Sequence, residues 1–101
     1  MTHVITGAFG TDRDHALGWK LHDRAAAEPR EYVHRVEFKP ALLVAPHVIA
    51  SISSIDASNS FGIRAAVDVV NVSVTGFDLV FRTWSDSEVF GLSASWMAIT
   101  A

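Results

Sequence analysis

The sequence contains no cysteine, which excludes a disulfide framework, a thiolate metal site and a cysteine nucleophile. Charged residues are also scarce: they make up 19% of the 101 residues, whereas half of the residues are hydrophobic. A disordered chain has too little apolar side chain to collapse, so this composition excludes disorder. The length suits a single domain that spans residues 1–101.

Long hydrophobic runs are missing as well. The longest uncharged stretch, Pro40 to Ile55, contains serines and a histidine and is too short and too polar to span a bilayer, so we expect no membrane insertion. The first residues lack the basic and apolar segments of a secretory signal peptide. This predicts synthesis in the cytoplasm, with any surface or virion display reached by a non-classical route.

Positive charge is sparse, and the net charge is −3. Phosphate backbones require concentrated lysine and arginine, so the composition argues against a nucleic-acid partner. Residues 40–101 contain two cations, Arg64 and Arg82, against five acidic residues. These two arginines therefore stand out as candidate functional residues.

Catalytic and metal-binding motifs are also lacking. The sequence has neither a Gly-x-Ser-x-Gly elbow nor a glycine-rich phosphate loop. The stretch from Asp12 to His15 offers two carboxylates and an imidazole, but it lacks the repeated oxygen ligands and the glycine of a calcium loop. We therefore predict that the chain is not an enzyme and binds no metal or cofactor.

Hydrophobic alternation predicts an all-β fold. Short alternating runs are separated by turn-forming residues, which favours a small antiparallel sandwich. The predicted strands are Val4 to Phe9, His34 to Lys39, His47 to Ile55, Arg64 to Val74, Phe77 to Trp84, and Val89 to Ile99. The predicted inner faces contain Val48, Ala50 and Ile52; Phe77, Leu79 and Phe81; and Phe90, Leu92, Ala94 and Trp96. Asp23 to Glu28 suits one helical turn before Pro29.

Two of these residues are open to two interpretations. Trp84 lies where a strand meets the Ser85–Ser87 turn, so it either lines a binding site or caps the core. Arg64 opens a strand after a polar loop. Its guanidinium offers several donors to hydroxyls or carboxylates, or it forms a structural salt bridge with Asp56 or Asp68.

An ordered series of short motifs resembles the H-type lectin domain, the domain of snail agglutinins and of the C-terminal part of discoidins. The series begins with Val4-Ile5-Thr6-Gly7-x-Phe9 and runs through Arg64 to the end of the chain. Its later members are Pro46-x-Val48-x-x-Ser51-Ile52-x-x-Ile55-Asp56, Asn71-Val72-Ser73-x-Thr75-Gly76-Phe77, Thr83-Trp84 and Ser95-Trp96-x-Ala98.

The resemblance implies a six-stranded antiparallel β-sandwich that assembles as a trimer. It also implies sugar sites between protomers that favour glycans with terminal galactose or N-acetylgalactosamine. Carried over residue by residue, the implied site contains Arg64, Trp84 and Phe90, with Ser85 where the snail protein has a histidine. The implied carboxylate is Asp23, with Glu28 as second choice.

Two rival functions remain at this point. One is a trimeric structural or attachment module, such as a spike, fibre or cell-adhesion component, in which the sugar site has degenerated. The other is a hydrolase, which would require a second carboxylate in the pocket. Hydrogen-bonding distance between Arg64 and either Asp23 or Glu28, beside Trp84, would favour the lectin.

Overall fold

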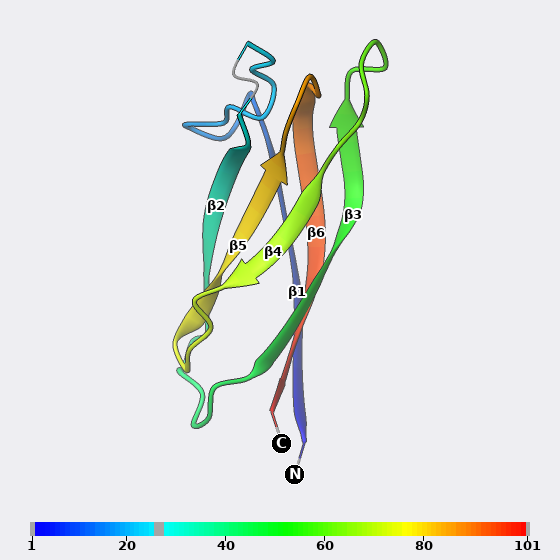
Figure 1. Ribbon diagram of the computed structural model, residues 1–101. Coiled ribbons are helices and arrows are strands. Elements are labelled where there is room, and N and C mark those ends of the chain that lie inside the picture. The colour runs from blue at the N-terminus through cyan, green and yellow to red at the C-terminus, as the bar shows by residue number, and fades with distance from the viewer. Residues whose placement is uncertain (1, 26–27, 101) are drawn as a thin grey trace.

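The computed structural model describes residues 2–25 and 28–100, and within these residues every regular element is a strand (Figure 1). The strands are β1 (His3–Asp12), β2 (Arg30–Glu37), β3 (His47–Ala57), β4 (Ala66–Val70), β5 (Gly76–Thr83) and β6 (Val89–Thr100). The predicted all-β class is confirmed, and each of the six predicted strands corresponds to an observed strand, although some bounds differ. In the described part of the chain, no helix has the length and hydrophobicity needed to cross a membrane.

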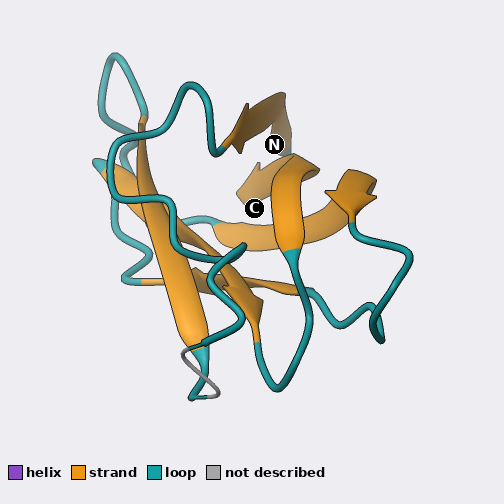
Figure 2. Ribbon diagram, turned by 90° about the horizontal axis from the view of Figure 1, so that it is seen from above, coloured by secondary structure: helices purple, strands orange, loops and turns teal. Residues whose placement is uncertain are grey.

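The strands form two antiparallel three-stranded sheets, ordered β1-β6-β3 and β2-β5-β4. The sheets lie over each other as the two layers of a sandwich (Figure 2). The sandwich is elongated, with extents of 49 × 22 × 20 Å. The two termini lie at one end, and the β1–β2, β3–β4 and β5–β6 connections gather at the other end (Figure 1).

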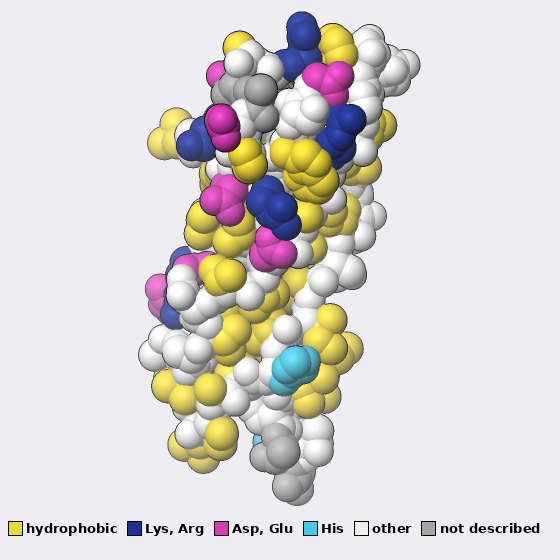
Figure 3. All heavy atoms as spheres, in the orientation of Figure 1, with side chains coloured by type: hydrophobic (Ala, Val, Ile, Leu, Met, Phe, Trp, Pro, Cys, Tyr) yellow, Lys and Arg dark blue, Asp and Glu magenta, His cyan; other side chains and the backbone are white. Residues whose placement is uncertain are grey.

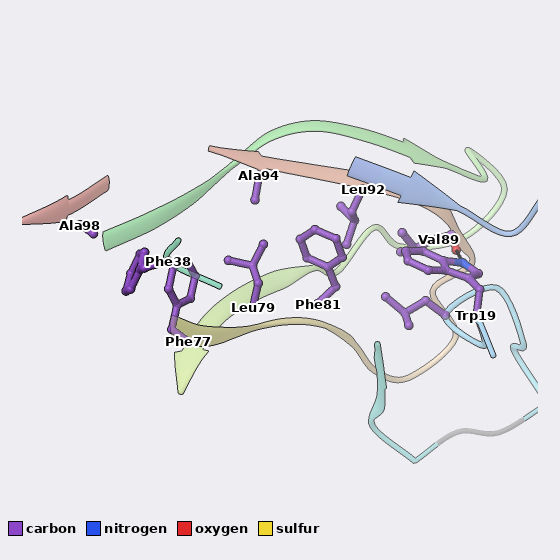
Figure 4. Close-up of a cluster of buried hydrophobic side chains, with 10 residues drawn as sticks. Trp19, Phe38, Phe77, Leu79, Phe81, Val89, Leu92, Ala94 and Ala98 are labelled. Carbon is purple, nitrogen blue, oxygen red and sulfur yellow. Dashed lines mark hydrogen bonds between the residues drawn. The ribbon is translucent and has the colours of Figure 1, made fainter. Parts of the chain in front are cut away.

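The core fills the space between the two sheets (Figure 4). Phe77, Leu79 and Phe81 of β5 are fully buried and face Leu92 and Ala94 of β6. Val48, Ala50 and Ile52 pack against this cluster from β3. The inner faces predicted for β3 and β5 are therefore confirmed, as strand alternation requires.

An indole packs against the core toward each end of the sandwich. Trp19, from the β1–β2 connection, is buried and donates from Nε1 to the Val89 carbonyl over 3.0 Å. Toward the termini, Trp96 packs edge-on against Phe77 with ring centroids 5.1 Å apart. A Cβ atom on Gly7 would lie 2.4 Å from the Trp96 ring, so a residue without a side chain is needed there. The predicted inward position of Trp96 is confirmed.

Three local predictions were wrong or only partly correct. Ala57 pairs with Val89 and Asp56 pairs with Gly91, so Phe90 is the extra residue of a β-bulge and Val89 occupies the core in its place. The fourth strand ends at Val70, because Asn71 takes a left-handed conformation with φ of 55°. Of the predicted helical turn, residues 23–25 form a non-helical turn, and Ala26 and Ala27 lie outside the described residues.

The outer faces of the two sheets differ in charge. On β1-β6-β3, four successive rows of paired residues contain no Asp, Glu, Lys or Arg, and we call this surface the uncharged face. Its residues are Val4, Ile99 and His47; Thr6, Met97 and Ile49; Ala8, Ser95 and Ser51; Gly10, Ser93 and Ser54.

The outer surface of β2-β5-β4, which we call the ion-pair face, has charged side chains on all three strands. Arg82 pairs with Asp68 at 3.1 Å and Arg35 pairs with Asp78 at 3.3 Å. Charged side chains gather over these strands and the connections beside them, whereas hydrophobic side chains mixed with uncharged atoms cover the part of this face nearer the termini (Figure 3). The predicted surface positions of Asp68 and Asp78 are confirmed.

Candidate functional site

The β3–β4 connection and the β5–β6 turn lie together at the end of the sandwich opposite the termini (Figure 1). Hydrogen bonds that involve backbone carbonyls join the β3–β4 connection to the end of β5 and to the turn. The Thr83 hydroxyl donates to the Arg64 carbonyl, and the Ser87 hydroxyl donates to the Gly62 carbonyl over 2.6 Å. The Ser58 amide donates to the Glu88 carbonyl over 2.9 Å. The two segments therefore form one rigid corner of the molecule, which we call the Arg64 corner.

The guanidinium of Arg64 lies at this corner and is partly exposed. Its Nη1 donates to Asp86 Oδ1 over 2.7 Å and to Ser87 Oγ over 3.2 Å. The side chains of Arg64 and Asp86 are 37% and 52% exposed, so solvent or a ligand reaches both. A Cβ atom on Gly62 would lie 2.8 Å from Nη1, so this glycine is the surface on which the guanidinium rests.

A second arginine supports the corner from inside. Arg30, the first residue of β2, is 2% exposed. Its Nη1 donates to the carbonyls of Leu21 and Asp23 over 3.1 Å and 2.7 Å, and its Nη2 donates to the Ser85 carbonyl over 2.9 Å. One buried guanidinium therefore ties the β1–β2 connection to the β5–β6 turn.

Three aromatic rings lie in or next to the segments of this end of the sandwich, and each has a guanidinium above it. Trp84 is half-buried, lies outside the core cluster of the described residues, and has Arg82 5.4 Å from its ring centroid. Phe61 and Phe90 are also half-buried. Arg24 lies 4.1 Å from the Phe61 centroid, and Arg13 lies 4.2 Å from the Phe90 centroid. These rings offer apolar surface beside hydrogen-bonding groups, which is the combination that sugar rings require.

The remaining predicted site residues lie on the neighbouring segments. Ser85 is exposed and has a φ of 62°, in the turn that leads to Asp86. The carboxylate of Asp23 accepts from the Ala25 amide over 3.1 Å, in the β1–β2 connection, and Glu28 is exposed. Among the described residues of a single chain, the ion pairs of Arg64 include neither Asp23 nor Glu28.

The salt bridge that was one of the two interpretations of Arg64 forms, but neither Asp56 nor Asp68 is the partner. Arg64 pairs with Asp86, and Asp68 pairs with Arg82 on the ion-pair face. Sequence analysis identified Ser85–Ser87 as a turn but did not select its acid. The sequence feature that could have selected Asp86 is its position two residues after Trp84.

The Asp12–His15 loop forms a separate polar cluster at the end of β1. His15 Nδ1 lies 2.7 Å from Asp12 Oδ1. This hydrogen bond is the main reason that the pKa of Asp12 is lowered and the pKa of His15 is raised. Within the described ranges, no group of three or more His, Cys, Asp or Glu side chains is arranged to hold a metal ion.

Comparison with known proteins identifies the family. A family model for the H-type lectin domain matches residues 33–99, which is more than half of the chain. The chain belongs to the H-type lectin family. The resemblance found in the sequence motifs is thereby confirmed, and the discoidins are similar to the same domain.

Individual relatives agree with this assignment. A Fuscovulum blasticum protein described as ATP synthase subunits region ORF 7 is 32% identical over 71 residues, 70% of this chain and 62% of that protein. Discoidin-1 of Dictyostelium discoideum is 33% identical over 70 residues, 68% of this chain and 28% of that protein. Recombinant discoidin II of the same organism superposes with a TM-score of 0.82 at 26% identity, over 97% of this chain and 36% of that chain. The chain thus spans less than two thirds of each relative's length.

Proposed function

We propose that this lectin domain binds galactose-type sugars, with N-acetylgalactosamine as the preferred ligand, at sites between the protomers of a trimer. The observation that carries the proposal is the Arg64 corner, where a partly exposed guanidinium of the β3–β4 connection donates to Asp86 and Ser87 in the turn that follows Trp84. In this proposal Arg64, Trp84 and Phe90 line the site and Asp23 supplies the carboxylate. Ser85 adds a contact from the neighbouring protomer.

The chemistry of the corner suits a sugar hydroxyl pair. The hydrogen bonds that Arg64 makes to other described side chains use only Nη1, so Nη2 and Nε keep donors to offer. A hydroxyl group accepts from such donors and donates to a carboxylate, so an arginine beside an acid recognises it from both sides. Trp84 and Phe90 supply apolar walls for the sugar ring and for the methyl of an acetyl group.

The uncharged face supports assembly through copies of this chain. Val4, Ile49 and Met97 are 54%, 52% and 39% exposed on it, and its four rows contain no Asp, Glu, Lys or Arg. A short chain buries a small fraction of its surface, so an uncharged sheet face with several exposed apolar side chains is stabilised by burial in an oligomer. Identical protomers meet through symmetry, and the family resemblance favours a threefold axis.

Titration calorimetry with N-acetylgalactosamine tests the proposed function. Wild type should release heat with this sugar and with methyl galactoside, and little with methyl glucoside. Arg64→Ala leaves sugar hydroxyls without their charged donor, at a cost of about 2 kcal/mol per site. This corresponds to roughly thirtyfold weaker binding.

A thermal melt of the same two proteins is the control. If Arg64 serves only as a structural partner of Asp86, the variant melts earlier while affinity per folded molecule is unchanged, and the sugar site is wrong. Absence of heat from wild type with every galactose-type sugar would instead favour the trimeric attachment module.

A further inference from the structure

The side chain that faces Arg64 within its own protomer is Asp86, at 2.7 Å from Nη1. We propose that Asp86 is the carboxylate that accepts from the bound sugar, so that the donor and the acceptor for adjacent sugar hydroxyls come from one chain. This inference rests on the proposed function and differs from it in one respect: the sugar-binding acid is Asp86 rather than Asp23.

The position of Asp86 is fixed by buried neighbours on both sides. The carbonyl of Ser85 accepts from buried Arg30. The side chain of Ser87 is fully buried, where it donates to the Gly62 carbonyl and accepts from Arg64. The carboxylate between them is 52% exposed and is therefore held in place while remaining open to a ligand. A group ordered before binding loses less conformational entropy when the ligand arrives.

Asp23 is a weaker candidate in its own chain for a geometric reason. Its carboxylate already accepts from the Ala25 amide within its own loop, whereas its carbonyl is the atom that Arg30 holds. The described contacts therefore assign Asp23 a role in loop shape. In contrast, Asp86 Oδ1 accepts from Arg64, and one carboxylate oxygen has room for further donors because it carries more than one lone pair.

The pair has a consequence for specificity. Galactose and glucose differ at one hydroxyl, which is axial in galactose and equatorial in glucose. A rigid pair of donor and acceptor recognises a hydroxyl by its direction, because hydrogen bonds weaken steeply when misaligned. We therefore assign to Asp86 the discrimination between these epimers, with Arg64 fixed against Gly62 as its partner.

Asp86→Asn and Asp23→Asn form a matched pair for the test, since each replaces a carboxylate by an amide of equal size. Calorimetry measures the affinity of each variant for methyl galactoside and methyl glucoside. Asp86→Asn should weaken galactoside binding about tenfold or more and reduce the ratio between the two sugars. Asp23→Asn should change both affinities less than about twofold, because its carboxylate is not at the Arg64 corner.

The outcomes separate this inference from the proposed function. Unchanged galactoside binding by Asp86→Asn would overturn the inference, because the carboxylate would then contribute nothing to affinity. Tighter binding would overturn it too, because Asp86 would then compete with the sugar for Arg64. A large loss of galactoside affinity in Asp23→Asn, with little loss in Asp86→Asn, would also overturn the inference, in favour of Asp23 as the sugar-binding acid. If wild type binds none of these sugars, both proposals fail together.

Gly62→Ala provides a second measurement that leaves both acids in place. A methyl group there would lie 2.8 Å from Arg64 Nη1, so the guanidinium must move away from Gly62. Gly62→Ala should reduce the ratio of galactoside to glucoside affinity as Asp86→Asn does. Circular dichroism should show that the variant is still folded. A folded Gly62→Ala protein with wild-type affinity and selectivity would show that the geometry of the pair does not determine binding.

Discussion

The two sheets have similar inner faces and different outer faces. Inside, both present buried apolar side chains to one shared core. Outside, β2-β5-β4 carries the Arg35–Asp78 and Arg82–Asp68 pairs, whereas β1-β6-β3 carries none of these residue types over four rows. Charged pairs remain in contact with water at little cost, whereas burying an exposed isoleucine or methionine side chain lowers the free energy. This difference is what we expect if the proposed assembly covers the outer face of β1-β6-β3 and leaves the outer face of β2-β5-β4 in water.

Placing a charge on each face is the strongest way to test this difference. Met97→Glu puts a carboxylate in the middle of the uncharged face, where copies of the chain would bury it without a partner. We expect it to dissociate the assembly from about three times the chain mass of 11.0 kDa to a monomer, as measured by light scattering at micromolar concentration. No other substitution discussed below should have so large an effect.

The matched control is Val33→Glu on the ion-pair face. Val33 is 55% exposed, more than the 39% of Met97, so exposure alone would make it the more sensitive position. We expect the mass of Val33→Glu measured by light scattering to equal that of wild type. A monomeric wild type, or dissociation by Val33→Glu in place of Met97→Glu, would reverse the assignment of the two faces.

The second test compares the two faces of one sheet. Phe81 is fully buried, and its ring centroid lies 6.2 Å from that of Phe9 and 6.4 Å from that of Trp19. Phe81→Ala should lower the free energy of unfolding by about 3–5 kcal/mol, because it removes apolar contacts and leaves a cavity. Val33→Ala, on the outer face, should change it by no more than about 0.5 kcal/mol. Urea unfolding at equal protein concentration measures both, and equal losses would contradict the layering described.

Much of this architecture was predictable from residue order. Alternation identified the inner faces of β3 and β5, because burial keeps a period of two from Val48 to Ile52 and because Phe77, Leu79 and Phe81 all face the core. Alternation failed at Phe90, because the bulge adds one residue to β6. As a result Val89, and not Phe90, faces the core. Alternation also extended β4 too far, since the valines after Asn71 suit a strand but the backbone turns away at Asn71.

The candidate site was predictable only in part. Arg64 and Trp84 were found because cations and tryptophans are few in this chain. Asp86 was missed because its contact with Arg64 spans 22 residues and exists only after the Ser87 and Thr83 hydroxyls join two separate loops. The role of Arg30 was hidden for the same reason, since its acceptors are backbone carbonyls that leave no trace in residue type.

A smaller test concerns the edge where the two sheets meet. His34 of β2 stacks on Phe9 of β1, with centroids 3.6 Å apart and planes 2° from parallel. Partial burial lowers the pKa of His34 below its ordinary value of 6.5. The unfolded chain therefore takes up this proton first, so the stabilisation is complete above about pH 6.5 and is lost as the pH falls through the lowered pKa.

Urea midpoints across this pH range measure the effect. His34→Phe keeps an aromatic ring on Phe9 and removes the titrating group, so the midpoint should fall less between neutral and mildly acidic pH than in wild type. His15 acts in the opposite direction, because its raised pKa favours the folded state at low pH. An unchanged pH dependence in His34→Phe would show that the junction between the sheets does not respond to this proton.

The smallest effect is expected from the ion-pair face itself. Asn71 and Arg35 both donate to the carboxylate of Asp78, and these contacts lower the pKa of Asp78, the Asn71 hydrogen bond most. The ionised Asp78 carboxylate therefore stabilises the folded state at any pH above the pKa of the unfolded chain, which is near the ordinary value of 3.8. This stabilisation is lost as the pH falls through the lower pKa of the folded state. Asp78→Asn should flatten the acid end of the stability profile, with only a slight loss at neutral pH that shrinks further in concentrated salt. A loss at neutral pH as large as that of Phe81→Ala would show that the charged surface, and not the buried side of the sheet alone, holds the sandwich together.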